Sequence, residues 1–351
     1  MEAQPLLGPN RGYQRPTSRR AGEEITVGDP SHRTVEANGI RIHVAEQGMG
    51  PLVLLCHGFP ESWYSWRHQL AALAEAGFRA VAPDMRGYGH SDSPSEAERY
   101  SMLHLVGDMV GLLDVLGEGS AVIVGHDWGA PIAWHAALLR PDRFRAVIAL
   151  SVPYRPRSSV PPTSHMPRTN DASFYQLYFQ TPGVAEAELE RDVRLSLRKI
   201  LYSASGDAPR RSSSAPDAGV AMVPNSGGFL TQMRNPEVLP HWLTETDLDF
   251  YTEQFAHSGF RGGLNWYRNM DRNWELTAAF AGASVSVPAL YMAGDRDVVV
   301  SFPGMGQVIS SLSRFVPNLR ATLMLPGCGH WTQQERPSEV SAAIIEFLRG
   351  L

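Results

Sequence analysis

The sequence is poor in the residues that mark several common protein classes. It has only two cysteines among its 351 residues, Cys56 and Cys328, which lie far apart and in no Cys-x-x-Cys spacing. This excludes a disulfide framework and a zinc ribbon, and a reducing, cytoplasmic location is therefore expected. Lysine is equally scarce, because Lys199 is the only one and all other basic residues are arginine. We attribute that bias to codon usage.

Charge of one sign and long apolar runs are also lacking. The formal net charge is −5, from 31 basic and 36 acidic residues, and no long block of either sign indicates a nucleic-acid partner. No stretch of about 18 uncharged apolar residues occurs, so no membrane span is predicted. The N-terminus has no apolar signal region, and residues 1–33 are expected to form a disordered tail.

The chain does contain enough apolar sequence for a large core, since 43% of its residues are hydrophobic. Short buried runs alternate with helix-like stretches over residues 34–152 and again over residues 282–351. The buried runs are residues 52–56, 80–82, 121–124, 146–150 and 289–292. Parallel strands with helices on both faces have this pattern, so we expect a mostly parallel α/β sheet flanked by helices.

The alternation stops over residues 153–281. This segment is richer in Pro, Tyr, Trp and charge, has helical stretches at residues 186–202 and 244–258, and shows no convincing buried strand. We therefore expect a helical cap inserted into the sheet domain. Within it, residues 203–228 are small, polar and rich in Pro and Gly, which predicts a flexible loop.

The most informative stretch follows one of the buried runs, where residues 125–129 read Gly-His-Asp-Trp-Gly. A strand, a Gly-x-Asp-x-Gly turn and a helix form the nucleophile-elbow pattern, with aspartate in place of serine. Glycines are needed because side chains at those positions would collide with the tight turn. Taken alone, the pattern suits equally well an Asp127 that serves as the N-cap of a helix.

Two further segments favour the elbow. A His-Gly-Phe-Pro sequence follows the first buried run, and Asp297 and His330 follow the last ones. Nucleophile, acid, histidine is the chain order of the α/β hydrolase fold, in which backbone N–H groups after an early strand and after the nucleophile form the oxyanion hole. We therefore expect that fold, with an eight-stranded sheet, Asp127 as nucleophile, and the N–H groups of Phe59 and Trp128 as the oxyanion hole.

An aspartate nucleophile restricts the chemistry. Its carboxylate attacks an sp³ carbon and forms an alkyl ester, which has to be hydrolysed in a second step. In that step His330, oriented by Asp297, removes a proton from the attacking water. Epoxides and alkyl halides both suit this scheme, and the two differ in leaving group.

The leaving group of an epoxide is an alkoxide, which calls for O–H donors. The expected cap contains six tyrosines, and residue type alone does not choose among them. They are Tyr154, Tyr175, Tyr178, Tyr202, Tyr251 and Tyr267.

These motifs together make the chain resemble the epoxide hydrolases of the α/β hydrolase fold, and most of all the C-terminal hydrolase domain of the vertebrate-type soluble enzymes. The resemblance covers residues 39–348. The matching segments are HGFPESW (57–63), DMRGYG (84–89), GHDWG (125–129), YQLYFQ (175–180), PGVAEAELE (182–190), SGFRG (258–262), LNWYRN (264–269) and CGHWT (328–332). The cap segments are the specific ones, because haloalkane dehalogenases share the HGFP and GHDWG motifs.

The resemblance implies conversion of epoxides to vicinal diols. It makes Asp127 the nucleophile, His330 the base and Asp297 its orienting acid. It makes Tyr175 and Tyr267 the pair whose phenols stabilise the opening epoxide oxygen. It implies an epoxide and water as the small-molecule partners, and a monomer or homodimer. No Gly-x-Gly-x-x-Gly, P-loop or His-Glu-x-x-His motif occurs, so no cofactor and no metal are expected.

Two departures from the vertebrate-type pattern have consequences. The N-terminal phosphatase domain of those enzymes has no counterpart here, so phosphatase activity is not expected. Residues 203–228 match nothing in the family pattern, which leaves the width of the substrate tunnel open. We expect six further residues to contact substrate, although core packing explains each of them equally well. They are His57, Pro60, Trp66, His126, Phe179 and Trp331.

Two alternative functions belong to other classes. A haloalkane dehalogenase could use the indole of Trp128 as a halide donor, but Phe59 is not an amide donor and the two tyrosine motifs would then have no role. A non-catalytic receptor with this fold would be indicated by a missing catalytic residue, and none is missing. The sequence therefore favours an epoxide hydrolase.

Overall fold

The computed structural model describes residues 28–209 and 221–351. Within them, one eight-stranded sheet has the order β1-β2-β4-β3-β5-β6-β9-β10. All pairs from β4 to β10 are parallel, and the pairs that include β2 are antiparallel. The expected α/β hydrolase sheet is therefore confirmed. Its strands are β1 (Ser31–Ala37), β2 (Ile40–Gln47), β3 (Leu52–Cys56), β4 (Arg79–Pro83), β5 (Ala121–His126), β6 (Phe144–Leu150), β9 (Ala289–Gly294) and β10 (Leu319–Leu325).

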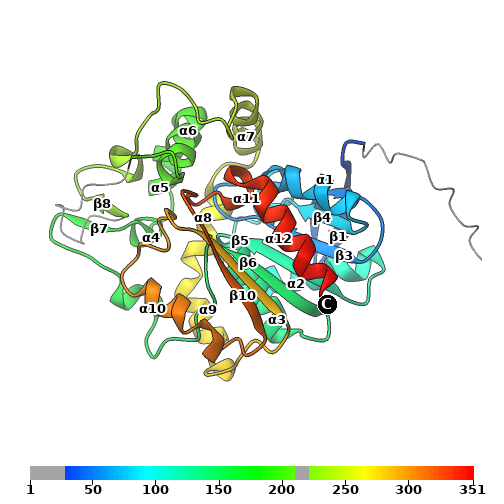
Figure 1. The fold of residues 1–351 in the computed structure, drawn as a ribbon. Coiled ribbons are helices and arrows are strands. Elements are labelled where there is room, and N and C mark those ends of the chain that lie inside the picture. Colours follow the sequence, from blue (N-terminus) through cyan, green and yellow to red (C-terminus); the bar gives the residue numbers. More distant parts are fainter. Residues whose placement is uncertain (1–27, 210–220) are drawn as a thin grey trace, which may run out of the picture.

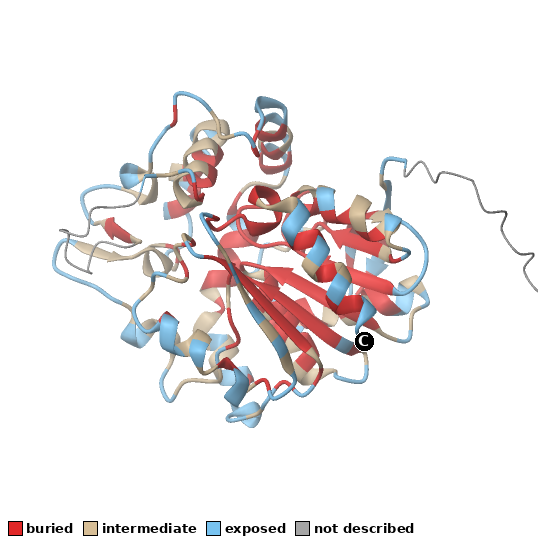
Figure 2. Cartoon of the chain, viewed as in Figure 1, coloured by how far each residue is buried: buried red, intermediate tan, exposed pale blue. Residues whose placement is uncertain are grey.

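Helices cover both faces of this sheet (Figure 1), and the strand sequences explain why. Successive side chains of a strand point to opposite faces, so an all-apolar strand contributes to two separate cores. Leu54 and Cys56 of β3 pack in the core that includes α2 and α3, whereas Val53 and Leu55 pack in the core that includes α1 and α12. Figure 2 shows the buried residues concentrated in the central strands. The four helices are α1 (Arg67–Glu75), α2 (Met102–Leu116), α3 (Gly129–Leu139) and α12 (Pro337–Arg349).

The cap, by which we mean residues 153–281, leaves the sheet after β6 and returns before β9. It lies beside the sheet in Figure 1. Two shorter helices, α10 and α11, belong to the later part of the chain. The bounds are α4 (Tyr175–Tyr178), α5 (Val184–Leu189), α6 (Val193–Ala204), α7 (Glu245–Ser258), α8 (Arg261–Arg268), α9 (Met270–Leu276), α10 (Met305–Ser310) and α11 (Thr332–Glu335).

The structure corrects two predictions inside the cap. The prediction of a loop over residues 203–228 is wrong at its start, because α6 continues to Ala204. It is also wrong near its end, where β8 (Met222–Pro224) pairs with β7 (Ala172–Phe174). That pairing depends on a partner about fifty residues away, which local composition does not reveal. Residues 210–220 of this loop lie outside the described residues. The single helix predicted over 186–202 is two helices, because the Asp192 side chain caps α6 anew.

The N-terminal prediction also needs correction. The predicted tail includes residues 31–33, but these belong to β1, which pairs with β2 from Ser31 opposite Glu46 onward. β1 is an edge strand with mostly exposed side chains, so its sequence lacks the alternation of apolar and polar residues that predicts a strand. The first 27 residues lie outside the described part of the chain. Across the described residues, no helix combines the length and apolar character needed to cross a membrane.

Candidate active site

Asp127 lies in the tight turn between β5 and α3. Its backbone is in the left-handed region, with φ of 50°, which a non-glycine residue adopts only under strain. A Cβ on Gly125 would collide with the carbonyl oxygen of Gly129, and a Cβ on Gly129 with that of Cys56. The N-cap of α3 is Trp128, not Asp127. The turn is therefore an elbow that presents the Asp127 side chain.

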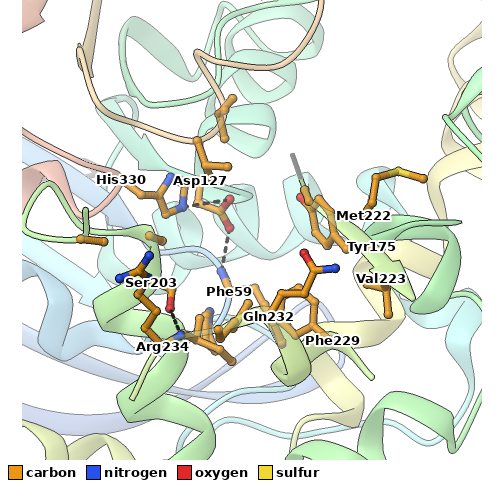
Figure 3. Close-up of a pocket in the computed structure, with 18 of the residues that line it drawn as sticks. Phe59, Asp127, Tyr175, Ser203, Met222, Val223, Phe229, Gln232, Arg234 and His330 are labelled. Atoms are coloured by element: carbon orange, nitrogen blue, oxygen red, sulfur yellow. Dashed lines mark hydrogen bonds and ion pairs between the residues drawn. The ribbon is translucent and has the colours of Figure 1, made fainter. Parts of the chain in front are cut away.

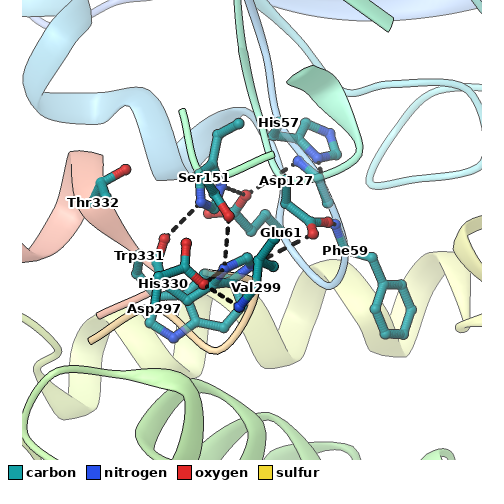
Figure 4. Close-up of polar contacts among 12 residues, drawn as sticks. His57, Phe59, Glu61, Asp127, Ser151, Asp297, Val299, His330, Trp331 and Thr332 are labelled. Atoms are coloured by element: carbon teal, nitrogen blue, oxygen red, sulfur yellow. Dashed lines mark hydrogen bonds and ion pairs between the residues drawn. The ribbon is translucent and has the colours of Figure 1, made fainter. Parts of the chain in front are cut away.

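The first contact of the Asp127 carboxylate is with the loop that follows β3. We call residues 57–60 the oxyanion loop, because the oxyanion hole is expected there. The backbone N–H of Phe59 donates a hydrogen bond of 2.8 Å to Asp127 Oδ1 (Figure 4). Gly58, next to it, has no room for a side chain, because a Cβ there would collide with the Asp127 carboxylate. Close approach of this loop therefore depends on glycine, and Oδ2 of Asp127 is left facing His330.

His330 lies between two carboxylates. Its Nε2 is 3.5 Å from Asp127 Oδ2, and its Nδ1 is 2.9 Å from Asp297 Oδ1. Burial lowers the pKa of His330, but the charges of Asp297 and Asp127 outweigh burial and raise it well above its ordinary value. Burial raises the pKa of Asp297, but the charge of His330 and its hydrogen bond bring it below its ordinary value. The three side chains form one charged cluster.

Tyr175 and Tyr267 come from different cap helices, and their rings meet in the cavity that Asp127 also lines. Tyr175 is the first residue of α4 and Tyr267 lies in α8. Their ring centroids are 6.0 Å apart with the planes at 74°, and both line the cavity that contains Asp127. Burial and the nearby charge of Asp127 raise the pKa of both phenols. Both therefore keep their protons at neutral pH and remain O–H donors.

A cavity of about 330 Å³ lies over these groups (Figure 3). Of the residues predicted to contact substrate, Pro60, Phe179 and Trp331 line it. A second cavity of about 140 Å³ lies beside Trp128 and shares Asp127 with the first. Asp127 thus lines both cavities. The apolar residues that complete the larger cavity include Ile200, Met222, Val223, Phe229, Met233, Val298, Val299 and Phe302.

Three residues predicted to contact substrate line neither of these two cavities. His57, Trp66 and His126 are fully buried and border neither cavity. Nε2 of His57 accepts a hydrogen bond from the backbone of Met85, and Trp66 packs in the core between the sheet, α1 and α12. The predictions for these three residues are wrong, because each side chain points behind the cavity wall.

His126 instead takes part in a buried polar network that sequence reasoning missed. Its ring nitrogens contact Glu61 Oε2 at 2.8 Å and the carbonyl oxygen of His330 at 2.7 Å. Glu61 also accepts hydrogen bonds from Gly58 N and from the side chain of Gln333. Glu61 is therefore bonded to Gly58, to His126 at the end of β5 and to Gln333 of α11, and His126 extends this network to the carbonyl oxygen of His330. The sequence signal for this network was Glu61 itself, a charged residue directly after the HGFP motif.

Ser151 is the second residue that the sequence did not single out. It follows β6 with φ of 71°, and its Oγ lies 3.2 Å from Nδ1 of His330. Its only sequence signal is its position at the end of a buried strand, at the same sheet edge as Asp127. Among residues 28–209 and 221–351, no group of three or more His, Cys, Asp or Glu side chains is arranged to hold a metal ion.

The sheet order, the elbow and the Asp–His–Asp cluster define an α/β hydrolase. A family model described as the alpha/beta hydrolase fold matches residues 51–337. Epoxide hydrolase A of Mycobacterium tuberculosis is 48% identical over 93% of this chain and 99% of that protein. The bifunctional epoxide hydrolase 2 of Sus scrofa is 42% identical over 88% of this chain and 53% of that protein.

Solved structures agree with these relatives. An epoxide hydrolase from an endophytic Streptomyces superposes with a TM-score of 0.87 at 48% identity and covers 92% of this chain and 96% of its own. The chain belongs to the epoxide hydrolases of the α/β hydrolase fold family. The resemblance predicted from the sequence motifs is thereby confirmed.

Proposed function

We propose that this protein converts epoxides to vicinal diols through a covalent ester on Asp127. One observation carries the proposal: a single carboxylate faces an N–H donor, an imidazole and two phenols on the wall of one largely apolar cavity. These are the groups that alkylation of an aspartate and hydrolysis of the resulting ester require. The two phenols favour an epoxide over an alkyl halide, because an alkoxide accepts hydrogen bonds from O–H groups.

In the first step the phenols of Tyr175 and Tyr267 donate hydrogen bonds to the epoxide oxygen. Because the Phe59 N–H holds Oδ1 of Asp127, Oδ2 is the attacking atom. A bond forms between Oδ2 and a ring carbon, and the bond between that carbon and the epoxide oxygen breaks. The alkoxide takes a proton from one phenol, which leaves an alkyl ester and a phenolate.

In the second step His330 acts as base. The ester carries no charge, so one of the two carboxylates that raise the pKa of His330 is lost and that pKa falls. His330 then releases its proton, which reaches the phenolate through solvent, and the neutral imidazole accepts a proton from water. The hydroxide attacks the ester carbonyl carbon, and the N–H groups of Phe59 and Trp128 bind the oxyanion. Its collapse breaks the bond between the carbonyl carbon and Oδ2, and the leaving alkoxide takes the proton of the new carboxyl group, which releases the diol. His330 is again protonated beside the Asp127 carboxylate, as at the start.

The test is diol formation by the purified protein from mono-substituted and trans-disubstituted epoxides, with Asp127→Ala as control. Diol that forms with the unchanged protein and not with the variant supports the proposal. Alkyl halides of matched size belong in the same panel, because halide release without diol formation would indicate a dehalogenase and contradict the proposal.

We further propose that the protein acts in the cytoplasm, as a monomer or homodimer, with residues 31–152 and 282–351 as the catalytic core and residues 153–281 as the cap. Support for the compartment comes from the two cysteines, which are free and buried. Cell fractionation tests the location, and sedimentation at several protein concentrations tests the assembly. Recovery in the membrane fraction, or a larger stable oligomer, would contradict these proposals.

A further inference from the structure

The loop that carries the catalytic base is bound to the end of cap helix α6. The backbone N–H of His330 donates to the carbonyl oxygen of Ala204 at 2.9 Å. The indole N–H of Trp331 donates to the carbonyl oxygen of Leu201 at 2.7 Å. The position of the main chain at residue 330 therefore depends on where α6 ends.

A third link joins the same two segments through one carboxylate. Glu335, in α11, is almost fully buried. Its Oε2 accepts the N–H groups of Gly206 at 2.9 Å and Gly329 at 2.8 Å, and its Oε1 accepts that of Trp331 at 3.1 Å. Glu335 thus binds the residue on each side of His330 and a residue of the segment that follows α6.

The two backbones joined by Glu335 are in direct contact. A Cβ on Gly206 would collide with the carbonyl oxygen of Gly327 and lie 2.8 Å from the nitrogen of Gly329. A Cβ on Gly329 would collide with the nitrogen of Gly206. Glycine at both positions therefore lets three N–H donors converge on one carboxylate.

We propose that Glu335 is a positioning residue, which holds the main chain of His330 against α6 so that the imidazole is aligned with the ester on Asp127. Glu335 lines neither cavity, so it acts through His330 and not on substrate. A carboxylate is suited to this place because it only accepts hydrogen bonds, whereas an amide would turn its NH₂ group toward at least one backbone N–H. The inference rests on the proposed function and deepens it.

The proposal predicts an effect on one step only. Alkylation of Asp127 uses the elbow and the two phenols, whereas hydrolysis of the ester needs a correctly placed His330. Glu335→Gln should therefore slow ester hydrolysis by about tenfold to a hundredfold, the scale of a misplacement near 1 Å. Alkylation should stay within about twofold of the unchanged protein, so that the ester accumulates during turnover.

The experiment is a single-turnover measurement with an epoxide that the unchanged protein hydrolyses, followed by mass spectrometry of the intact protein to give the ester fraction over time. Glu339→Gln is the matched control, because Glu339 is an exposed glutamate on the neighbouring helix α12. Gly206→Ala disturbs the same junction from the cap side. Gly206→Ala should also slow ester hydrolysis more than alkylation. It replaces Glu335→Gln as the test variant if Glu335→Gln does not fold.

The outcomes separate this inference from the proposed function. Slower ester hydrolysis with near-normal alkylation in Glu335→Gln or Gly206→Ala supports a positioning role. Unchanged rates per folded active site, with only a lower stability, would show that Glu335 is structural and overturn the inference. Equal slowing of both steps would overturn it as well. Absence of any ester on the unchanged protein while diol still forms would overturn the covalent mechanism itself.

Discussion

At the scale of single residues, the charge of Asp127 has two uses in the proposed reaction. As a free carboxylate it is the nucleophile, and it helps to raise the pKa of His330. Once it is alkylated, that charge is gone, the pKa of His330 falls, and more of the imidazole is in the neutral form that can accept a proton. The two steps are therefore coupled through the 3.5 Å separation of Asp127 and His330.

Replacing the base should separate the two steps. In His330→Gln, we expect alkylation of Asp127 to proceed and hydrolysis of the ester to slow by about a thousandfold or more, because the general base is gone. Mass spectrometry of peptides from the variant, taken after exposure to epoxide, should show the adduct on the Asp127 peptide. An unmodified peptide at saturating epoxide would contradict the assignment.

The two phenols should contribute jointly to ring opening. Tyr175→Phe and Tyr267→Phe each remove one O–H donor from the site, so each should slow alkylation by about tenfold to a hundredfold. Either phenol can still donate in the other's absence, so the double variant should be slower by much more. Pre-steady-state alkylation rates give this comparison, and full activity in the double variant would remove both phenols from the mechanism.

The residues that could be predicted are those whose place is fixed by a backbone motif. The elbow and the strand ends determine where Asp127 and His330 lie, so their spacing in the sequence was sufficient. The direction of an aromatic or imidazole side chain near these motifs depends on tertiary packing. Trp66 and His126 therefore turn into the core, and Ser151, which carries no motif, was missed.

At the scale of secondary-structure elements, a short turn of the cap forms part of the substrate wall. The 3₁₀ helix η5 (Phe229–Gln232) places the ring of Phe229 against Tyr175, with centroids 5.9 Å apart and planes at 30°. The N–H groups of Phe229 and Leu230 donate to Glu188 of α5 at 2.8 and 2.9 Å. Glu188 thereby fastens η5 to the rest of the cap.

Loosening that contact should affect substrate binding more than chemistry. Glu188→Gln replaces one accepting oxygen by an NH₂ group that faces backbone N–H donors, so η5 should shift. We expect KM to rise by about threefold to tenfold, which corresponds to about 1 kcal/mol, with ester hydrolysis little changed. Steady-state kinetics beside Glu253→Gln, an exposed cap glutamate, test this expectation. An unchanged KM would count against it.

The elements of the sheet were predictable because each central strand is an unbroken apolar run between helices. The elements of the cap were less predictable from the sequence. β8 is only three residues long and is held by β7, so neither strand has enough sequence of its own to indicate a strand. β1 is an exposed edge strand, whose polar sequence resembles the tail that precedes it.

At the scale of the whole molecule, the buried charges of the site also contribute to stability. The pKa of His330 is raised above its ordinary 6.5 on folding, so its contribution is fully present below pH 6.5 and is lost as pH rises through the folded value. The pKa of Asp297 is lowered below its ordinary 3.8, so its contribution is present above pH 3.8 and is lost as pH falls through the folded value.

Both contributions are complete only between those two ordinary values. The unfolding free energy of the unchanged protein should therefore exceed that of His330→Gln most strongly between about pH 4 and 6.5. The difference should shrink as the pH is raised further. Denaturant unfolding of both proteins across this pH range is the measurement, and a difference that does not vary with pH would contradict the role of the pair.

The fold as a whole and the meeting of Asp127, Asp297 and His330 at one place could thus be predicted from the sequence, because order along the chain determines both in this architecture. The cavity could not, because its walls come from short segments that are held by distant partners. Glu335 is an example, since it lies in none of the matching motifs and its place is defined only by the backbone groups that it binds.

The placement of the cap between β6 and β9 also bears on how such a protein changes over evolutionary time. Asp127, Asp297 and His330 all lie outside that segment, whereas Tyr175, Tyr267 and Phe229 lie inside it. Apart from the two tyrosines, mutations in most of the cap can therefore change the cavity wall while descendants inherit the Asp–His–Asp cluster unchanged. The end of α6 differs from the rest of the cap, because mutations there change the segment to which the loop of His330 is hydrogen-bonded.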